Sequence, residues 1–492
     1  MIKYISTRGM ETCCSASEAI VKGIADDKGL FVPTEIPRLN VELDELARLE
    51  YKDIAKLVIG TFFTDFTKEE IDYCVEHAYD EKFDTPEIAP VTTVGDSYFL
   101  ELYHGKTAAF KDMALSILPY LMTTAMHKIG MNKKVCILTA TSGDTGKAAL
   151  EGFADVENTE IIVFYPKDGV SEVQRRQMTT QSGKNVHVYA IEGNFDDAQS
   201  GVKNLFMDEK FADKIAEKGY VFSSANSINI GRLIPQVAYY VYAYSRLLKI
   251  DEIRAGEKIN VTVPTGNFGN ILAAYYAMQM GIPINKLICA SNENNVLTDF
   301  FNSGKYDIKR EFVLSNSPSM DILISSNLER LLYHFSTARD VASMMQNLDK
   351  KMEYEVSDSI RDKLGVFACG FADMNLTCKT IGDLYSKQKY LMDTHTSVAY
   401  AVYDEYRKKT GDETKTVIVS TASPYKFPRS VACSIGIETD GLDDFVCATK
   451  LSEETELKIP EAIDGLENRR VIHSKVFSKT EMPEAVKEAL CL

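Results

Sequence analysis

The chain has 492 residues, of which 45% are hydrophobic and 26% are charged, so it is long enough for two or three folded domains. Its formal net charge of −16 argues against a nucleic-acid partner, and an anionic ligand would need local positive groups. The 10 cysteines show no Cys-x-x-Cys pair and no zinc-type spacing, so we expect reduced thiols and no metal site. The N-terminus lacks the apolar core of a signal peptide, and no apolar run could span a bilayer. We therefore expect a cytoplasmic protein without membrane contact.

The first 99 residues are predicted to form a helix-rich N-terminal region. Helical patterns are expected at 15–24, 41–60 and 67–79. The last of these begins with Thr67-Lys-Glu-Glu70, which resembles a capping box. No residue pattern in this region indicates a catalytic or ligand-binding site.

From about residue 98, apolar strand patterns alternate with helical patterns, which is typical of βαβ units around a buried parallel sheet. Strands are expected at 134–139, 160–165, 185–190, 258–264, 286–290 and 416–420. Helices are expected at 146–153, 171–180, 195–216, 230–248, 271–280 and 397–409. We expect a smaller α/β domain at 100–250, a larger one at 251–437 and an acidic, helical appendage at 438–492.

The stretch 104–119 joins a glycine-containing turn to an apolar, helix-like run, with Lys111 near the predicted helix start beside Phe110. A partly desolvated lysine at a positive helix terminus should have its ammonium form disfavoured. Such an amine can act as a nucleophile or form a Schiff base. The pattern alone is weak evidence, because most lysines near helix starts are solvated surface charges.

Three predicted strands end in loops of unusual composition, and open parallel α/β sheets bind ligands beyond such carboxyl ends. The loop 139–146 is rich in small and hydroxyl residues that bring backbone N–H groups to an anion, although a plain βα turn fits equally well. The loop 263–272 combines Gly266 and Gly269 with two asparagines before a helix. This suits a phosphate that is held rather than transferred, and a tight turn with an asparagine cap is the alternative.

The third loop, 419–427, closes a strand with Ser420 and Thr421 and carries Lys426 after a proline-containing turn. A hydroxyl can hydrogen-bond a neutral ring nitrogen without forcing it to protonate, but an ordinary strand exit also explains this pattern. Between the loops, hydroxyl and amide donors at 222–236 precede Arg232. That stretch could bind a second anion or cap the helix that follows.

Together these four stretches resemble the threonine synthase family of pyridoxal-phosphate enzymes of fold type II. His-Gly-x-Thr-x-Ala-Phe-Lys-Asp, Thr-Ala-Thr-Ser-Gly-Asp-Thr-Gly, Ser-Ala-Asn-Ser-Ile-Asn-Ile, Gly-Asn-Phe-Gly and Thr-Ala-x-Pro-x-Lys-Phe occur in family order over nearly the whole chain. The long N-terminal region resembles the bacterial and fungal branch. The resemblance implies an α/β architecture of two parallel-sheet domains with a helix-rich N-terminal region.

The resemblance also implies a role for each motif. Lys111 would be the catalytic residue and would carry pyridoxal 5'-phosphate as a Schiff base. Thr421 would hydrogen-bond the pyridine nitrogen, and one loop would hold the cofactor phosphate: Gly266, Asn267, Phe268, Gly269 and Asn270. A second loop would hold the substrate near the ring: Ser142, Gly143, Asp144 and Thr145. The candidates for binding the substrate phosphate are Ser224, Asn226, Ser227, Asn229 and Arg232.

Four positions depart from related patterns. Lys106 stands where the family has proline, Ser423 replaces a histidine, and Asn270 stands where aspartate is common. Asp144 takes the place where related sulfhydrylases carry an asparagine beside the phenolic oxygen of the ring. A carboxylate there would repel a phenolate, so Asp144 must be protonated, displaced or paired with a cation.

The implied reaction is that of a lyase in threonine biosynthesis, which converts O-phosphohomoserine and water to threonine and phosphate. A phospho-lyase that releases phosphate, ammonia and a 2-oxo acid is the nearest alternative, and a cofactor-retaining binding protein is another. An unrelated nucleotide-binding protein would need a P-loop or a Gly-x-Gly-x-x-Gly fingerprint, which the sequence lacks. The sequence leaves open whether the protein is a monomer or a homodimer, whether an effector regulates it, and which base activates the water.

Overall fold

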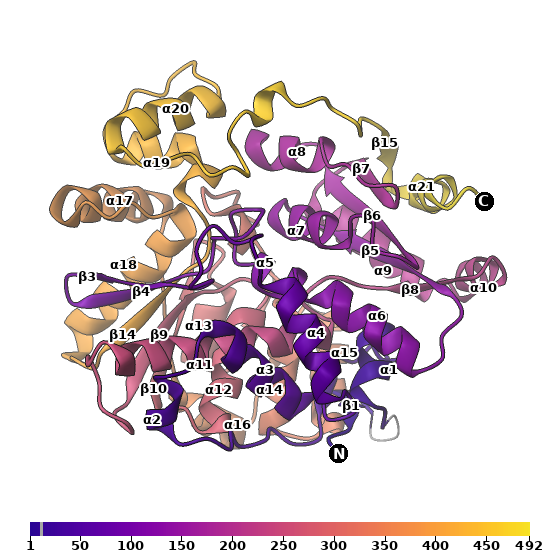
Figure 1. The fold of residues 1–492 in the computed structure, drawn as a ribbon, viewed down its shortest axis with the longest axis horizontal. Helices are drawn as coiled ribbons and strands as arrows, with labels where there is room; N and C mark the ends of the chain where they lie inside the picture. Colours follow the sequence, from indigo (N-terminus) through magenta and orange to yellow (C-terminus); the bar gives the residue numbers. More distant parts are fainter. Residues whose placement is uncertain (10–12) are drawn as a thin grey trace.

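A computed structural model of the protein describes residues 1–9 and 13–492. These residues form two separate sheets surrounded by helices (Figure 1). The larger sheet has the strand order β13-β10-β9-β14-β4-β3, with β3 (Val91–Val94), β4 (Ser97–Glu101), β9 (Ile259–Pro264), β10 (Ile284–Ser291), β13 (Phe367–Phe371) and β14 (Thr416–Ser420). Its strands run parallel except β3, which pairs antiparallel with β4 at one edge.

The smaller sheet is parallel throughout. Its strand order is β15-β7-β6-β5-β8, with β5 (Lys134–Ala140), β6 (Thr159–Pro166), β7 (Val186–Glu192), β8 (Tyr220–Ser223) and β15 (Val476–Ser478). The last strand comes from the C-terminal segment, which thus returns to the edge of this sheet. Two short antiparallel pairs complete the strands: β1 (Tyr4–Ser6) with β2 (Phe31–Pro33), and β11 (Lys305–Asp307) with β12 (Glu353–Glu355).

The helices fall into groups along the chain. The N-terminal region contains α1 (Ala16–Lys22), α2 (Leu43–Leu46), α3 (Tyr51–Phe62) and α4 (Lys68–Ala78). Around the smaller sheet lie α5 (Asp112–Leu115), α6 (Leu118–Lys128), α7 (Asp144–Phe153), α8 (Glu172–Thr179), α9 (Phe195–Met207), α10 (Glu209–Glu217) and α21 (Met482–Ala489). The remainder are α11 (Ile230–Lys249), α12 (Gly269–Met280), α13 (Val296–Ser303), α14 (Leu328–Phe335), α15 (Ala338–Lys351), α16 (Asp358–Lys363), α17 (Met374–Gln388), α18 (Thr394–Thr410), α19 (Pro428–Ser434) and α20 (Asp444–Thr455).

Both faces of the larger sheet are covered by helices. Along β10, Leu287 and Cys289 belong to the core shared with α12, whereas Ile288 and Ala290 belong to the core shared with α18. Successive side chains of a strand point to opposite faces, so a strand buried on both sides is continuously apolar. The first of these cores also contains residues of β5, α3 and α11, so the two sheets share one continuous apolar cluster.

The fold class predicted from the sequence is confirmed, and so is the capping box at Thr67, whose hydroxyl accepts from Glu70 N–H. Two expected helices are each split in two. The pattern at 195–216 is broken at Asp208, whose side chain caps α10 by accepting from the Phe211 amide at 3.0 Å. The pattern at 41–60 is divided between α2 and α3. Within residues 1–9 and 13–492, no helix has the length and apolar character needed to cross a bilayer.

Candidate active site

One cavity lies where β5, β9 and β14 end, between the two sheets. It receives residues from loops that are far apart in the sequence. Its lining is Phe110, Lys111, Ala140, Thr141, Ser142, Asp144, Thr145, Asn226, Ser227, Arg232, Gln236, Pro264, Thr265, Gly266, Asn267, Phe268, Gly269, Asn270, Ser319, Met320, Ile322, His395, Thr421 and Ala422. A position beyond the carboxyl ends of parallel strands is where such folds bind small ligands.

Lys111 occupies the N-cap position of α5, directly after a tight loop. Asp112 closes that loop, because its carboxylate accepts from the backbone N–H of Thr107 at 2.8 Å and from the hydroxyl of Thr107 at 2.7 Å. Gly105 has no room for a side chain, since a Cβ there would lie 2.5 Å from the Asp112 carboxylate. The lysine is therefore presented by a fixed turn.

The loop before Lys111 is bound to the loop that follows β14. The Phe110 amide donates to the Thr421 carbonyl at 2.8 Å, and the Ser423 amide donates to the Ala108 carbonyl at 3.0 Å. These two bonds form a bridge between segments about 300 residues apart in the chain and bring Lys111 and the Thr421 hydroxyl into one cavity.

The Lys111 amine is desolvated, which disfavours its ammonium form. Its pKa is lowered from 10.5 to about 8, with burial as the largest cause. The carboxylate of Asp144 raises this pKa, whereas the charges of Arg232 and Lys426 act in the same direction as burial. The neutral amine is the form that attacks an aldehyde or accepts a proton, so a lower pKa increases its reactive fraction at neutral pH.

The turn after β9 forms a cradle at the N-terminus of α12. Ser325 donates to the Gly266 carbonyl at 2.6 Å, and the Asn327 amide donates to the Asn267 carbonyl at 3.0 Å. Phe268 adopts a left-handed conformation, with φ of 64°. The first N–H groups of a helix have no acceptor within that helix, so this turn is suited to binding an anion.

Asn270 extends the cradle with an oriented amide. Its oxygen accepts from the hydroxyls of Tyr239, at 2.7 Å, and Tyr240. Its Nδ2 atom is buried and has no hydrogen-bond partner among the residues that the structure describes. The two tyrosines thus direct a free donor into the cavity, and this donor requires an acceptor from a ligand.

Arg232 places a second buried donor in the cavity. It lies in the first turn of α11, is 2% exposed, and donates through Nη1 to the Ala225 carbonyl at 2.8 Å. Its Nε atom has no partner within 1–9 and 13–492, and burial lowers the pKa of the guanidinium to about 10. A buried guanidinium with an unused N–H group is suited to an anionic ligand.

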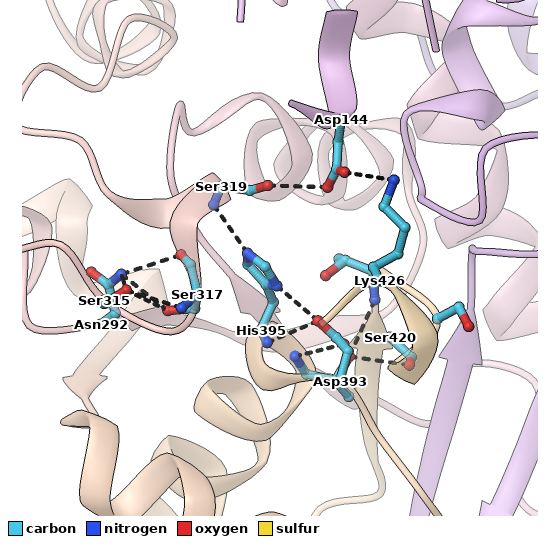
Figure 2. A network of polar contacts seen from close by, with 12 residues as sticks. Asp144, Asn292, Ser315, Ser317, Ser319, Asp393, His395, Ser420 and Lys426 are labelled. Carbon is cyan, nitrogen blue, oxygen red and sulfur yellow. Dashed lines mark hydrogen bonds and ion pairs between the residues drawn. The ribbon is translucent and has the colours of Figure 1, made fainter. Parts of the chain in front are cut away.

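Asp144 is paired with a cation, which is one of the three states expected for it. Its Oδ1 atom lies 2.9 Å from Lys426 Nζ and accepts from Gln174 Nε2 at 2.9 Å. Its Oδ2 atom accepts from the Ser319 hydroxyl at 3.1 Å (Figure 2). Burial alone would raise the pKa of Asp144, but the ammonium groups of Lys426 and Lys111 hold it below its usual range.

Two residues that the sequence analysis missed, His395 and Ser319, also line the cavity. His395 Nδ1 lies 2.8 Å from Asp393 Oδ2, and His395 Nε2 accepts from the Ser319 amide at 3.1 Å (Figure 2). Since a backbone N–H can only donate, the proton of the ring is on Nδ1 and points to Asp393. Asp-Thr-His-Thr at the start of α18 was the available sequence signal, because an aspartate two residues before a histidine can both cap a helix and orient the ring.

Three of the sequence-predicted residues lie outside the lining of the cavity. Asn229 caps α11 and donates to the carbonyls of Ile20 and Ser224, both at 3.0 Å. The Ser224 hydroxyl accepts from the Asn226 amide at 3.1 Å. Gly143 precedes α7 with φ of 135°, and a Cβ there would collide with the Gln174 amide. All three support the loops that carry residues of the lining.

The two departures near the lysine loop lie away from the cavity as well. Lys106 is exposed, whereas Ser423 is buried and its hydroxyl accepts from the Tyr425 amide at 3.3 Å. Among the described residues, no cluster of His, Cys, Asp and Glu has a metal-binding arrangement. The cavity instead offers the Lys111 amine, which can react with a carbonyl group, and hydrogen-bond donors that suit an anion.

Pyridoxal phosphate fits these residues. The cofactor needs an amine for its aldehyde, an anion cradle for its phosphate and a partner for its ring nitrogen. Lys111, the 266–270 turn and Thr421 would supply these groups around one cavity. Asn270 Nδ2, which has no partner among the described residues, would add a donor at the cradle.

Comparisons with known proteins agree with this chemistry. Three family models match the chain: "Threonine synthase N terminus" at residues 3–79, "Pyridoxal-phosphate dependent enzyme" at 90–422 and "Threonine synthase, C-terminal" at 396–490. The chain is 38% identical over 438 residues to human "Threonine synthase-like 1", a match that covers 86% of this chain but only 58% of that protein.

Two further relatives match over nearly their full length. The chain is 37% identical over 441 residues to "Threonine synthase" of Pseudomonas aeruginosa, which covers 87% of this chain and 90% of that protein. A crystal structure of pyridoxal-phosphate-bound threonine synthase from Brucella melitensis superposes with a TM-score of 0.86 at 34% identity and 100% coverage of both chains. The resemblance, the fold class and the cofactor inferred from the sequence are confirmed. The chain belongs to the threonine synthase family of pyridoxal-phosphate-dependent enzymes.

Proposed function

We propose that this protein is a threonine synthase that converts O-phosphohomoserine and water to L-threonine and phosphate. The observation that carries the proposal is the buried Arg232 guanidinium in the same cavity as Lys111, whose Nε atom has no partner among the described residues. With a net charge of −16, the protein needs local cations to hold a doubly anionic substrate. A buried guanidinium without a carboxylate partner is the group that a substrate phosphate would neutralise.

We assign the cofactor contacts as follows. Lys111 would hold the aldehyde carbon, Thr421 would hydrogen-bond the pyridine nitrogen, and the 266–270 turn would hold the phosphate of the cofactor. The Thr421 hydroxyl could donate to a neutral ring nitrogen and so would not require that nitrogen to be protonated. The bound cofactor supplies an electron sink for the charge left on the substrate's α-carbon.

We assign the substrate contacts to two loops. Ser142, Asp144 and Thr145, on a turn shaped by Gly143, would hold the amino-acid end of the substrate. Asn226, Ser227 and Arg232 would hold its phosphate, and Ser224 and Asn229 would keep that loop in position. The second group lies at the N-terminus of α11, where the helix dipole also favours negative charge.

The neutral Lys111 amine is the proposed proton carrier. The free Lys111 amine would take the α-proton of the bound substrate and return protons to the product. Loss of a second proton, from the β-carbon, would allow phosphate to leave from the γ-carbon. The two protons would return to the α-carbon and the γ-carbon, and water would supply the β-hydroxyl group and pass its own proton to the released phosphate. The cytoplasmic location stays a prediction from the sequence, and whether the protein is a monomer or a homodimer stays open.

Product analysis with O-phosphohomoserine tests the proposal. The purified protein, loaded with pyridoxal phosphate, should release one phosphate for each threonine formed. Equal amounts of phosphate, ammonia and 2-oxo acid without threonine would contradict it and indicate the phospho-lyase. Absence of turnover, with the cofactor still bound, would contradict both reactions and leave a cofactor-retaining binding protein.

A further inference from the structure

The active-site cavity contains an uneven set of buried charges. Lys111 and Arg232 line it together with one carboxylate, Asp144, and a third cation, Lys426, lies directly behind that carboxylate. Lys426 is completely buried, and Asp144 is 4% exposed. Among these three cations, only Lys426 lies within ion-pair distance of the Asp144 carboxylate. The counterion of Asp144 matters because its charge also affects the pKa values of the neighbouring groups.

The contacts of Lys426 show that it is the counterion of Asp144. Its ammonium group forms an ion pair with Asp144 Oδ1 at 2.9 Å and donates to Gln177 Oε1 at 2.5 Å and to the Thr107 carbonyl at 3.3 Å. These three oxygen atoms belong to different segments of the chain. Lys426 is thus fixed by one residue each from α7, α8 and the lysine loop.

Two further donors contact the Asp144 carboxylate. Gln174 Nε2 donates to Oδ1, the atom paired with Lys426. The Ser319 hydroxyl donates to Oδ2 (Figure 2). None of these three partners is Lys111, although the Asp144 carboxylate is near enough to raise the pKa of the Lys111 amine. The three partners hold the carboxylate in a position where it is not bonded to that amine.

We infer that Lys426 is a positioning residue whose ammonium group takes up the Asp144 carboxylate, so that this carboxylate does not pair with the Lys111 amine. The inference rests on the proposed role of Lys111 but not on the identity of the substrate. Without Lys426, Asp144 would be left as a buried, uncompensated anion, and Lys111 is the other cation whose charge already lowers the pKa of this carboxyl group.

The other charged groups near these residues do not replace Lys426. Arg232, from α11, lowers the pKa of Lys111. Asp112, from α5, is bound to Thr107, and Lys147, from α7, is paired with Glu151 at 2.8 Å. His395 donates to Asp393 and accepts from Ser319, so it also has its own partners.

Competitive labelling measures the state of the Lys111 amine directly. The full-length chain, freed of cofactor, is treated with trace acetic anhydride between pH 6 and 10, and acetylation is quantified by peptide mass spectrometry. Exposed Lys458 serves as the reference amine within each sample, and circular dichroism verifies that each variant is folded. Wild-type Lys111 should titrate near its pKa of about 8.

The variant K426M should shift this titration upward by about one pH unit, which is about a tenfold lower rate at pH 7. K426R, which keeps the charge, should stay within about twofold of wild type, and the double variant D144N/K426M should recover most of the wild-type rate. An unshifted titration in K426M would overturn the inference, as would a shift that the double variant fails to reverse.

D144N alone provides the test if K426M does not fold. Removing the carboxylate while keeping Lys426 and Arg232 should raise the labelling rate of Lys111 at pH 7, and an unchanged or lower rate would overturn the inference. Borohydride reduction of the wild-type holoenzyme separates this result from the assignment of function. Pyridoxyl fixed to another lysine would contradict the proposed role of Lys111, whereas the labelling experiment would still decide what Lys426 does.

Discussion

At the scale of single residues, two features of the cavity carry the chemistry: a desolvated amine and an unpaired guanidinium. The low dielectric around Lys111 disfavours its ammonium form. Burial likewise lowers the pKa of the Arg232 guanidinium. In the proposed function, a ligand would complete both residues. Lys111 would gain a covalent partner, and Arg232 would gain a counterion.

Lys111→Ala should abolish the visible absorbance of the lysine-bound cofactor, because no amine remains at that position to bind the aldehyde. Turnover should fall by at least about a thousandfold, since the proposed covalent partner and proton carrier are lost together. Absorbance spectra and borohydride reduction followed by peptide mapping measure the first effect. Retention of the wild-type spectrum, with pyridoxyl on another lysine, would contradict the assignment.

Arg232→Gln should weaken substrate binding and leave cofactor binding unchanged. Loss of a charge-assisted hydrogen bond of about 1.5–3 kcal/mol corresponds to roughly a 10- to 150-fold lower kcat/KM for O-phosphohomoserine. The cofactor spectrum should stay unchanged, because the 266–270 turn is intact. If the variant loses cofactor while its KM stays constant, Arg232 serves the cofactor phosphate instead.

At the scale of elements, the 315–321 segment links the two sides of the cavity. Asp321 fixes it by accepting from Asn292 at 2.7 Å and from the Ser315 hydroxyl at 2.6 Å. Ser319 then reaches Asp144 through its hydroxyl and His395 through its amide. The segment also packs against the phosphate cradle, where the Ser319 carbonyl lies close to Gly266.

Gly266→Ala should therefore disturb both the cradle and the 315–321 segment. A Cβ at this position would lie 2.8 Å from the Ser319 carbonyl, so one of the two backbones must move. Overpacking costs about 1–3 kcal/mol, which predicts about a 5- to 150-fold weaker affinity for pyridoxal phosphate. Titration by absorbance measures this affinity. Gly60→Ala in α3, where a Cβ meets nothing within 4 Å, is the matched control and should bind as wild type does.

The start of the lysine loop is held by a charged histidine. His104 lies 2.6 Å from Asp84 Oδ1 and 3.0 Å from Glu101 Oε2. Burial alone would lower its pKa, but these two carboxylates raise it to about 9, above the ordinary value of 6.5. A raised folded-state pKa means that the stabilisation is fully present below pH 6.5 and is lost as the pH rises through 9.

His104→Gln should accordingly destabilise the protein most at pH 6 and least at pH 10. Urea unfolding of wild type and variant at pH 6, 8 and 10 measures the difference in the free energy of unfolding. A difference that stays constant over this range would show that the ionic contacts of His104 contribute nothing to stability.

At the scale of the whole molecule, the cavity lies between the two sheets. The Ser142–Thr145 loop follows β5 of the smaller sheet, whereas the 266–270 turn and Thr421 follow β9 and β14 of the larger one. A ligand that contacts both sides binds the folded chain alone. It therefore stabilises the folded state by mass action.

Removal of pyridoxal phosphate should therefore lower the thermal unfolding temperature. A free concentration of about 100 times the Kd corresponds to about 2.7 kcal/mol of stabilisation. Calorimetry over a range of cofactor concentrations should give a Tm that rises with the logarithm of the concentration. A Tm independent of cofactor would mean that the site is not loaded under those conditions.

The sequence by itself determined the local features. The alternation of apolar strands and helical patterns predicted six strands, three of each sheet, whereas β3, β4, β8, β13 and β15 were not predicted. Lys111 was placed near a helix start, and the loops around Gly266 and Thr421 were placed at strand ends; residues of all three line the cavity. The helices of the 291–396 region were not predicted, because their short patterns gave no clear period. The correct predictions share one cause, which is that backbone conformation and strand or helix period depend on neighbouring residues.

Only the tertiary structure decided which charged and polar groups on these loops contact one another. The counterion of Asp144, the role of Ser319 and the presence of His395 at the cavity follow from contacts between residues 144, 319, 395 and 426. Asn229 looked like a phosphate ligand but is a helix cap turned toward Ile20. Local sequence specifies which donors and acceptors a loop offers. The packing of distant segments decides which of them meet, because hydrogen bonds and ion pairs require contact within about 3 Å.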